Sequence, residues 1–260
     1  MNYETLVITK KDDITTVALN RPEVHNAMNE ALMNELTHCF QHLSVDDSVT
    51  AVILTGNGKS FCAGADLIWM KKMVAYTMEE NKKDSRLLLE MYETIHSCPK
   101  PVIGRINGAA FGGGIGLLAV CDITITSPEV LFAFSEAKLG IIPAVISTFV
   151  ATRMTPATMR RLFITAERFD AVAAQRNGLI DVIVPVEKLD EAVSTCIEQI
   201  RSCGPTAIGE VKHLIYNLQK METRDFKEYA IEKISELRVS EDGQEGIKSF
   251  LEKRKPLWRR

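Results

Sequence analysis

The sequence predicts an α/β protein with largely parallel sheets, and three observations support this prediction. Short stretches rich in β-branched residues alternate with amphipathic stretches as far as Pro185. Two strand candidates, TAVILTG (50–56) and PVIGRING (101–108), are continuously apolar, which is typical of strands buried on both faces. After Pro185 the pattern becomes wholly helical. We therefore expect a core of β–α–β units at 1–185 and a helical region at 186–260.

The expected elements follow one another with short connections. TLVITK and ITTVAL are separated by the polar turn KDD, which predicts two neighbouring strands. In chain order we expect strands at 5–10, 14–19, 50–56, 101–108, 121–127, 131–134 and 179–185, and helices at 29–43, 78–97, 144–152, 156–166 and 170–176. A further short helix is expected directly after the glycine run at 112–114. The C-terminal helices are expected to break at 203–205 and near 242–243.

The composition indicates an ordinary globular protein and excludes several classes. Hydrophobic residues make up 46% and charged residues 25%, and the net charge of -3 gives no basic field for nucleic acid. No apolar run reaches the roughly 18 residues of a membrane span, and no signal peptide is evident, so we expect a cytoplasmic protein. The six cysteines form no CxxC pair and are expected to be reduced. His38 and His42 lack a third ligand nearby, so no metal site is expected.

Three common signatures are missing from the sequence. GNGKS resembles the end of a phosphate-binding loop, but the glycine that such a loop needs five residues earlier is replaced by Ile53. The glycines of GGGIG have the wrong spacing for a dinucleotide-binding GxGxxG motif, and no GxSxG motif occurs. The sequence therefore favours neither a nucleotide-binding protein nor a serine hydrolase.

Two loops of small residues each follow a buried strand. FCAGADL (61–67) and NGAAFGGGIG (107–116) can both present free backbone N–H groups, the second at the start of a helix. Two such amides that converge on one point would form an oxyanion hole, which a side chain would obstruct. The residues alone leave a second interpretation open, in which the glycines 112–114 only permit close packing of a helix on a strand.

Five motifs together make the whole chain resemble the crotonase (enoyl-CoA hydratase/isomerase) superfamily: RPEVHNAMN, FCAGADL, NGAAFGGGIGLLAVCDI, SEAKLGIIP and FLEKRKP. The resemblance implies a crotonase-like ββα spiral core with a C-terminal helical trimerisation region, in a homotrimer or hexamer. It also implies an enzyme that stabilises the enolate of an acyl-CoA thioester. By position, the oxyanion donors are the N–H groups of Ala65 and Gly113.

The resemblance also implies a binding site for the CoA thioester. It assigns substrate contacts to His25, Ala27, Ala63, Ala65, Asp66, Leu67, Gly112, Gly113, Gly116 and Lys253. Lys253, or Arg254 beside it, would come from a neighbouring subunit. No metal and no redox cofactor is implied, because coenzyme A arrives as part of the substrate.

Glu136, in SEAKLGIIP, is the carboxylate that the resemblance assigns to proton transfer. Its flanking residues Phe132, Phe134 and Leu139 predict an apolar environment, which would raise its pKa. Hydratases of the family use a second glutamate two positions after the triple glycine, but here that position is Gly116. The sequence therefore predicts a site in which Glu136 is the sole acid and base.

A narrower resemblance within the superfamily indicates which acyl group the substrate carries. GGGIG, IIPAVIS and TAERFDA together resemble the bacterial 3-methylglutaconyl-CoA hydratase branch, which acts in leucine breakdown. Such a substrate carries a distal carboxylate, for which Arg86, Lys138 and Arg161 are candidate cations.

Four other functions stay open at this point. A Δ3,Δ2-enoyl-CoA isomerase moves one proton between two carbons and needs a single carboxylate, and an acyl-CoA decarboxylase needs one acidic group. RNA binding would use the lysines at 71–72 and 82–83, although acidic residues interleave with them. A catalytically inactive protein would bind acyl-CoA esters and turn over none.

Overall fold

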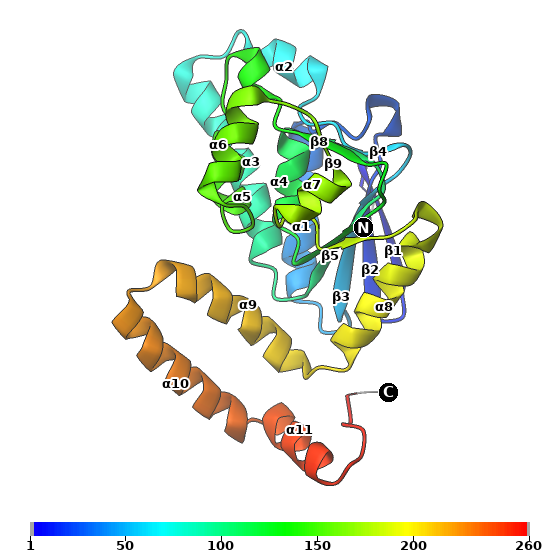
Figure 1. Cartoon of the computed structure of the whole chain (residues 1–260), viewed down its shortest axis with the longest axis vertical. Helices are drawn as coiled ribbons and strands as arrows, with labels where there is room; N and C mark the ends of the chain where they lie inside the picture. The colour runs from blue at the N-terminus through cyan, green and yellow to red at the C-terminus, as the bar shows by residue number, and fades with distance from the viewer. Residues whose placement is uncertain (1–2, 259–260) are drawn as a thin grey trace.

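Two sheets form the core of the computed structural model, which describes residues 3–258 (Figure 1). The larger sheet has six strands in the order β1-β2-β3-β5-β7-β10, and all its neighbours are parallel except β1 and β2. Its strands are β1 (Leu6–Lys11), β2 (Ile14–Leu19), β3 (Ala51–Gly56), β5 (Val102–Ile106), β7 (Ile123–Thr126) and β10 (Val182–Ile183). The predicted parallel sheet is therefore present, although the last strand is shorter than the apolar run at 179–185 suggests.

A second, smaller sheet consists of four short strands. Its order is β4-β6-β8-β9, with β4 (Ser60–Cys62), β6 (Ala109–Phe111), β8 (Leu131–Ala133) and β9 (Phe169–Asp170). Strands β3, β5 and β7 of the large sheet are each followed by one strand of the small sheet and then by helix. This repeated strand–strand–helix unit is the spiral that the family resemblance implies, and it places the chain segments after β4 and β6 side by side.

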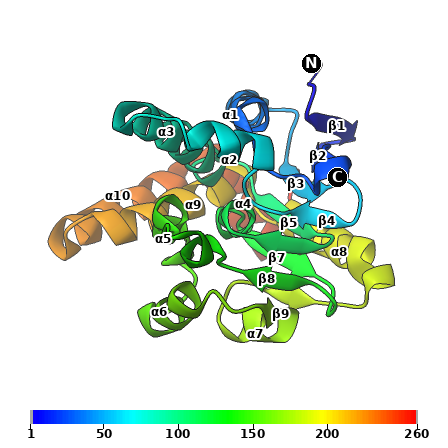
Figure 2. The same ribbon diagram turned by 90° about the horizontal axis from the view of Figure 1, so that it is seen from above.

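Within residues 3–258, seven α-helices precede the C-terminal region. They are α1 (Glu30–Ser44), α2 (Leu67–Met73), α3 (Met78–His96), α4 (Gly113–Ala119), α5 (Ala144–Val150), α6 (Pro156–Thr165) and α7 (Ala171–Arg176). Helix α3 begins at a capping box in which Thr77 and Glu80 satisfy each other's backbone amides. Helix α4 lies near the centre of the core in Figure 2, packed against α5 and against β4 and β6.

Short 3-10 turns connect several of these elements and hold two of the predicted motifs. They are η1 (Pro22–Val24), η2 (Glu136–Leu139) and η3 (Val186–Lys188). The first lies in RPEVHNAMN, and the second carries the predicted catalytic glutamate.

The C-terminal region is helical, as predicted. Its first helix buries apolar side chains on the core, whereas the helices after it are largely exposed. Helix α8 (Leu189–Arg201) buries Leu189 and Val193 against the large sheet. Helices α9 (Pro205–Lys220), α10 (Thr223–Val239) and α11 (Glu241–Leu251) form an arm that lies apart from the sheets in Figure 1. No residue of α9 or α10, both fully described, is buried. The arm exposes the large apolar side chains Val211, Ile215, Leu218, Ile231, Ile234, Val239, Ile247, Phe250 and Leu251.

The described residues contain no helix that combines the length and the apolar character needed to cross a membrane.

Candidate oxyanion site

The loop FCAGADL is held by main-chain bonds to the turn that precedes α1. The Met28 N–H donates to the Gly64 carbonyl at 2.7 Å, and the Asp66 N–H donates to the Met28 carbonyl at 2.8 Å. Ala65, between them, pairs with Met28 as an isolated parallel bridge. In such a parallel bridge Met28 bonds to the residues before and after Ala65, and the residue between those two directs its own N–H away from the partner. The Ala65 amide therefore points to the side opposite Met28.

The Asp66 carboxylate fixes the exit of this loop. One oxygen accepts from the Ile68 amide at 2.7 Å and from the Trp69 amide at 3.3 Å, which caps α2. The other accepts from the Arg21 guanidinium at 2.7 Å. Burial opposes the charge, but the hydrogen bonds from Arg21 and the two amides outweigh it and lower the pKa of Asp66. The carboxylate thus stabilises the loop, and its predicted contact with substrate stays a prediction.

The glycine loop lies directly against FCAGADL. Gly112 has φ 49° and ψ -122°, and its N–H donates to the Ala133 carbonyl at 2.9 Å. A Cβ on Gly64 would stand 2.9 Å from the Phe111 carbonyl oxygen and 4.0 Å from the Gly112 Cα. The two loops are therefore in van der Waals contact, and a side chain at Gly64 would force them apart.

This contact brings together the loops that carry Ala65 and Gly113, whose amides are the predicted donors. Gly113 is the first residue of α4, so its N–H has no acceptor within the helix. Across residues 3–258 neither amide donates to a protein acceptor. Both residues are half-buried. Two unused N–H groups from touching loops are what a thioester oxyanion requires.

Glu136 lies beside these loops. Its Oε1 is 3.3 Å from the point where a Cβ on Gly112 would stand, so a side chain at 112 would displace the carboxylate by a few tenths of an ångström. Its Oε2 is buried and finds no hydrogen-bond partner within residues 3–258. Burial raises the pKa of the Glu136 carboxyl. A buried carboxylate with an unused oxygen and a raised pKa is suited to proton transfer.

Gly116 does not open onto free space. It is buried in α4, and a Cβ there would stand 2.5 Å from Cγ2 of Ile146 and 2.6 Å from Cζ of Tyr92. The position at which the resemblance places a second carboxylate is therefore filled by neighbouring side chains. Sequence reasoning missed Tyr92, because nothing near it in the chain signals a contact with α4.

The predicted contacts near the N-terminus lie against the same loop. His25, at φ 55°, has its Nδ1 3.0 Å from the Ser60 hydroxyl oxygen. The Ala63 N–H donates to the His25 carbonyl at 3.0 Å, and Ala27 is buried. Leu67, at the start of α2, is 74% exposed. The structure thus brings RPEVHNAMN and FCAGADL together, while their contacts with CoA stay a prediction.

The predicted cations are distributed over the surface. Lys253 follows α11, which Figure 1 places at the opposite end of the molecule from α2, so the site of its own chain is out of reach. Arg86 and Lys138 are exposed, and Arg161 pairs with Glu167. A cation that the sequence did not signal is Arg168, whose guanidinium lies 5.5 Å from the centre of the Phe111 ring in the glycine loop.

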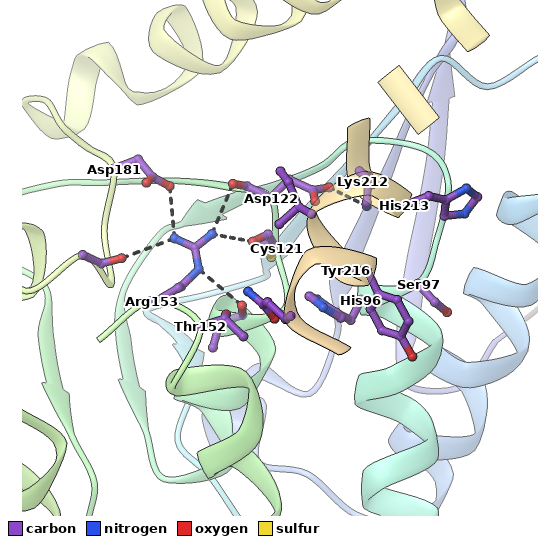
Figure 3. Close-up of a pocket in the computed structure, with 14 residues that line it drawn as sticks. His96, Ser97, Cys121, Asp122, Thr152, Arg153, Asp181, Lys212, His213 and Tyr216 are labelled. Atoms are coloured by element: carbon purple, nitrogen blue, oxygen red, sulfur yellow. Dashed lines mark hydrogen bonds and ion pairs between the residues drawn. The ribbon is translucent and has the colours of Figure 1, made fainter. Parts of the chain in front are cut away.

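A cavity of about 580 Å³ lies elsewhere, between the ends of α3 and α5 and helix α9 (Figure 3). No residue predicted for the site lines it. Its charged groups pair with one another: Lys212 lies 2.6 Å from Asp122, and Arg153 lies 3.3 Å from Asp181. Burial lowers the pKa of His96, which also lines this cavity. The first pair attaches α9 of the arm to the core and the second joins two core segments, and neither presents chemistry related to the two loops.

Comparison with known proteins decides the family. A model of the enoyl-CoA hydratase/isomerase family matches residues 9–260. This chain belongs to that family. A short-chain-enoyl-CoA hydratase of Clostridium acetobutylicum is 32% identical over 257 residues, which cover 98% of this chain and 97% of the relative.

Solved structures of enoyl-CoA hydratase/isomerase relatives share the fold. An enoyl-CoA hydratase from Shewanella pealeana has a TM-score of 0.94 at 37% identity and covers 98% of this chain and 96% of its own. Pseudomonas aeruginosa AtuE has a TM-score of 0.96 at 32% identity and covers 99% of this chain and 100% of its own. The predicted crotonase-like fold is confirmed. Members of the family act on acyl-CoA thioesters and are generally oligomeric.

Proposed function

We propose that this protein is an enoyl-CoA hydratase in which Glu136 is the sole acid and base. One observation carries the proposal: the buried, unpartnered Oε2 of Glu136 lies next to the loop that presents the Gly113 amide. Relatives named enoyl-CoA hydratases at about 30% identity support the reaction class.

Hydration of the double bond needs one proton to be moved. Glu136 takes a proton from water, and the hydroxide oxygen attacks C3 of the enoyl thioester. The electron pair of the C2=C3 bond moves toward the thioester oxygen, where the amides of Ala65 and Gly113 stabilise the enolate. Glu136 then returns the proton to C2. Water is added across one face, and the carboxylate ends in its starting state. No metal or redox cofactor is part of this proposal.

The finer proposal for the substrate is 3-methylglutaconyl-CoA, hydrated or formed by dehydration in leucine catabolism. The similarity of GGGIG, IIPAVIS and TAERFDA to that branch supports it. Arg168, above Phe111 of the glycine loop, supplies a cation near the site that suits a distal carboxylate.

A homotrimer or hexamer completes the proposal. The apolar side chains along α9, α10 and α11 are exposed in the single chain, as expected of an obligate interface. A neighbouring copy would also offer Lys253 to the site, which its own chain cannot do. Its ammonium suits the phosphates of CoA.

The alternative is a Δ3,Δ2-enoyl-CoA isomerase, which the filled space at Gly116 favours. Glu136 would take a proton from C2 of a 3-enoyl thioester and return it to C4. The same two amides would stabilise the dienolate, and no water would enter.

A turnover panel separates the two reactions. Purified protein would receive 3-methylglutaconyl-CoA, 3-hydroxy-3-methylglutaryl-CoA, crotonyl-CoA and a 3-enoyl-CoA, with products measured by mass. We expect the gain or loss of one water with the first two. Product of unchanged mass from the 3-enoyl ester alone would identify an isomerase.

Glu136→Gln is expected to lower kcat by about 10²–10⁴-fold, because it removes the group that moves the proton. Glu129→Gln makes the same chemical change at an exposed position and should leave kcat unaltered. Retention of more than a few per cent of activity in Glu136→Gln would exclude the single-carboxylate mechanism.

A further inference from the structure

Tyr92 connects α3 to the first turn of α4. Its side chain is fully buried, and its ring lies 5.7 Å, centre to centre, from that of Phe149. Its hydroxyl donates to the Gly113 carbonyl at 2.7 Å and lies 3.8 Å from the Met28 sulfur. A tyrosine on a neighbouring helix thus holds the same residue whose N–H is the second oxyanion donor.

Two glycines of α4, Gly113 and Gly116, lie directly against the Tyr92 side chain. A Cβ on Gly113 would stand 3.0 Å from the Tyr92 hydroxyl oxygen and 2.1 Å from Cε of Met28. A Cβ on Gly116 would stand 2.6 Å from Cζ and 2.7 Å from Oη of Tyr92. At Gly113 the tighter contact is therefore with Met28, whereas at Gly116 a Cβ would collide with both Ile146 and the Tyr92 phenol. A side chain at 116 would take the space that Tyr92 occupies.

The glycine run needs such a restraint. Gly112, Gly113 and Gly114 have no side chains to limit their backbone angles, so the start of α4 is intrinsically adaptable. An oxyanion donor is effective only when its direction is set before the reaction. The Tyr92 hydroxyl is the side-chain donor that reaches this turn, and its bond to the Gly113 carbonyl fixes the orientation of that residue.

The hydroxyl acts as a donor throughout the working pH range. Burial, together with the nearby Glu136 carboxylate, raises the pKa of Tyr92 well above its usual value. The phenol keeps its proton and does not serve as a base. Its contribution to the chemistry is therefore positional.

We propose that Tyr92 is a positioning residue: its hydroxyl holds Gly113 so that the Gly113 amide faces the thioester oxygen, and its ring occupies the place of a second carboxylate. This inference rests on the proposed oxyanion chemistry and extends it to a residue of α3. It makes Tyr92 and Gly116 a matched pair that keeps Glu136 as the single carboxylate.

Tyr92→Phe is the direct test, because it removes the hydroxyl and keeps the ring. We expect kcat for the best substrate of the panel to fall about 5- to 20-fold, as the loss of one aligned hydrogen bond implies, with KM changed less than twofold. Bound 2,4-hexadienoyl-CoA should absorb at longer wavelength than free ligand in the parent protein, since the amides polarise its carbonyl. That shift should shrink in Tyr92→Phe.

Thr37→Val is the matched control. The Thr37 hydroxyl is also buried and donates to a backbone carbonyl, that of Met33, at 2.9 Å, but Thr37 belongs to neither loop of the site. Both variants should lower the thermal midpoint by a similar amount, while only Tyr92→Phe reduces kcat and the absorption shift.

The outcomes separate this inference from the proposed function. Parent-like kcat and absorption shift in Tyr92→Phe would overturn the role of Tyr92 and leave the hydratase proposal intact. A parent protein that hydrates no thioester but shows a shift that Tyr92→Phe reduces would overturn the hydratase proposal alone. An equal loss of kcat in Thr37→Val, or no shift in the parent protein, would overturn the inference.

Discussion

The two loops that carry the proposed oxyanion amides are restrained by different forces. Ala65 is held by a charge: the buried Asp66 carboxylate binds Arg21 and caps α2, and main-chain bonds to Met28 complete the clamp. Gly113 is held by neutral contacts, namely the hydrogen bond from the Tyr92 hydroxyl to its carbonyl and the packing of the Tyr92 ring on α4. The Ala65 loop should therefore lose its geometry when the Asp66 charge is removed. The Gly113 loop should lose its geometry when a methyl group is added at Gly116.

The largest effect is expected from Asp66→Ala. The Arg21 side chain is 15% exposed and the Asp66 side chain 4%, so the substitution leaves a nearly buried guanidinium without its partner. Breaking such a pair costs about 3–5 kcal/mol, and the cap of α2 is lost as well. Denaturant unfolding should show this loss of stability, and the activity should disappear with it.

Asp190→Ala is the control for the loss of a charge pair. Asp190 lies 2.6 Å from Arg105, but its side chain is 83% exposed. Such a pair contributes less than about 1 kcal/mol. Equal destabilisation by the two substitutions would show that the first loop is not held by its buried charge.

Gly116→Ala should have the next largest effect. The new methyl group would stand under 3 Å from Ile146 and Tyr92, and overpacking of this kind costs about 1–3 kcal/mol. Because Tyr92 also holds Gly113, kcat should fall by more than the loss of stability alone would cause. Thermal unfolding and kcat at a temperature well below the midpoint would measure the two effects separately.

Gly209→Ala, in α9, makes the same change on a helix with ordinary space. Its nearest neighbour, the Pro99 carbonyl oxygen, would lie 3.5 Å from the new Cβ. Alanine is favoured over glycine in helices by about 1 kcal/mol, so this variant should be as stable as the parent or more so. Unchanged stability and kcat in Gly116→Ala would show that the loop of Gly113 does not depend on the fit between Gly116 and Tyr92.

The smallest effect concerns the carboxylate between the loops. Because burial raises the pKa of Glu136, the folded protein binds this proton more tightly than the unfolded chain. Ionisation therefore costs stability, which falls as pH rises from the unfolded-state value through the raised folded-state value. Glu136→Gln should raise the thermal midpoint slightly at pH 7, and this gain should vanish near pH 4. A gain that is independent of pH would contradict the assignment.

Sequence patterns predicted the large sheet because its strands carry long signals. The apolar runs at 50–56 and 101–108 became β3 and β5, and the helical pattern after Pro185 became helices α8 to α11. Of the small sheet only β8 was expected, as the strand at 131–134. Its other strands, β4, β6 and β9, are two or three residues long, which is too short a pattern for any periodicity to be detected. Strands β4, β6 and β9 overlap the motifs FCAGADL, NGAAFGGGIG and TAERFDA.

The candidate site was predicted in part for a related reason. Glu136 and the two amide positions follow from local motifs that resemble a known family. Tyr92 lies 21 residues before Gly113 and on another helix, so its hydrogen bond arises from tertiary packing. The helical pattern at 78–97 marks Leu88, Met91 and Ile95 as the apolar side of a helix, and it gives the phenol of Tyr92 no distinction in the sequence.

The fit of Gly116, Tyr92 and Ile146 also limits how this active site can change by mutation. A glutamate introduced at 116 alone meets two side chains at contact distances that no rotamer avoids, because the clash begins at Cβ. Shortening Tyr92 first opens a buried void and releases Gly113. Any mutational route to a two-carboxylate site therefore passes through an impaired intermediate unless positions 92 and 116 change together, and a library that varies both is the appropriate starting point for redesign.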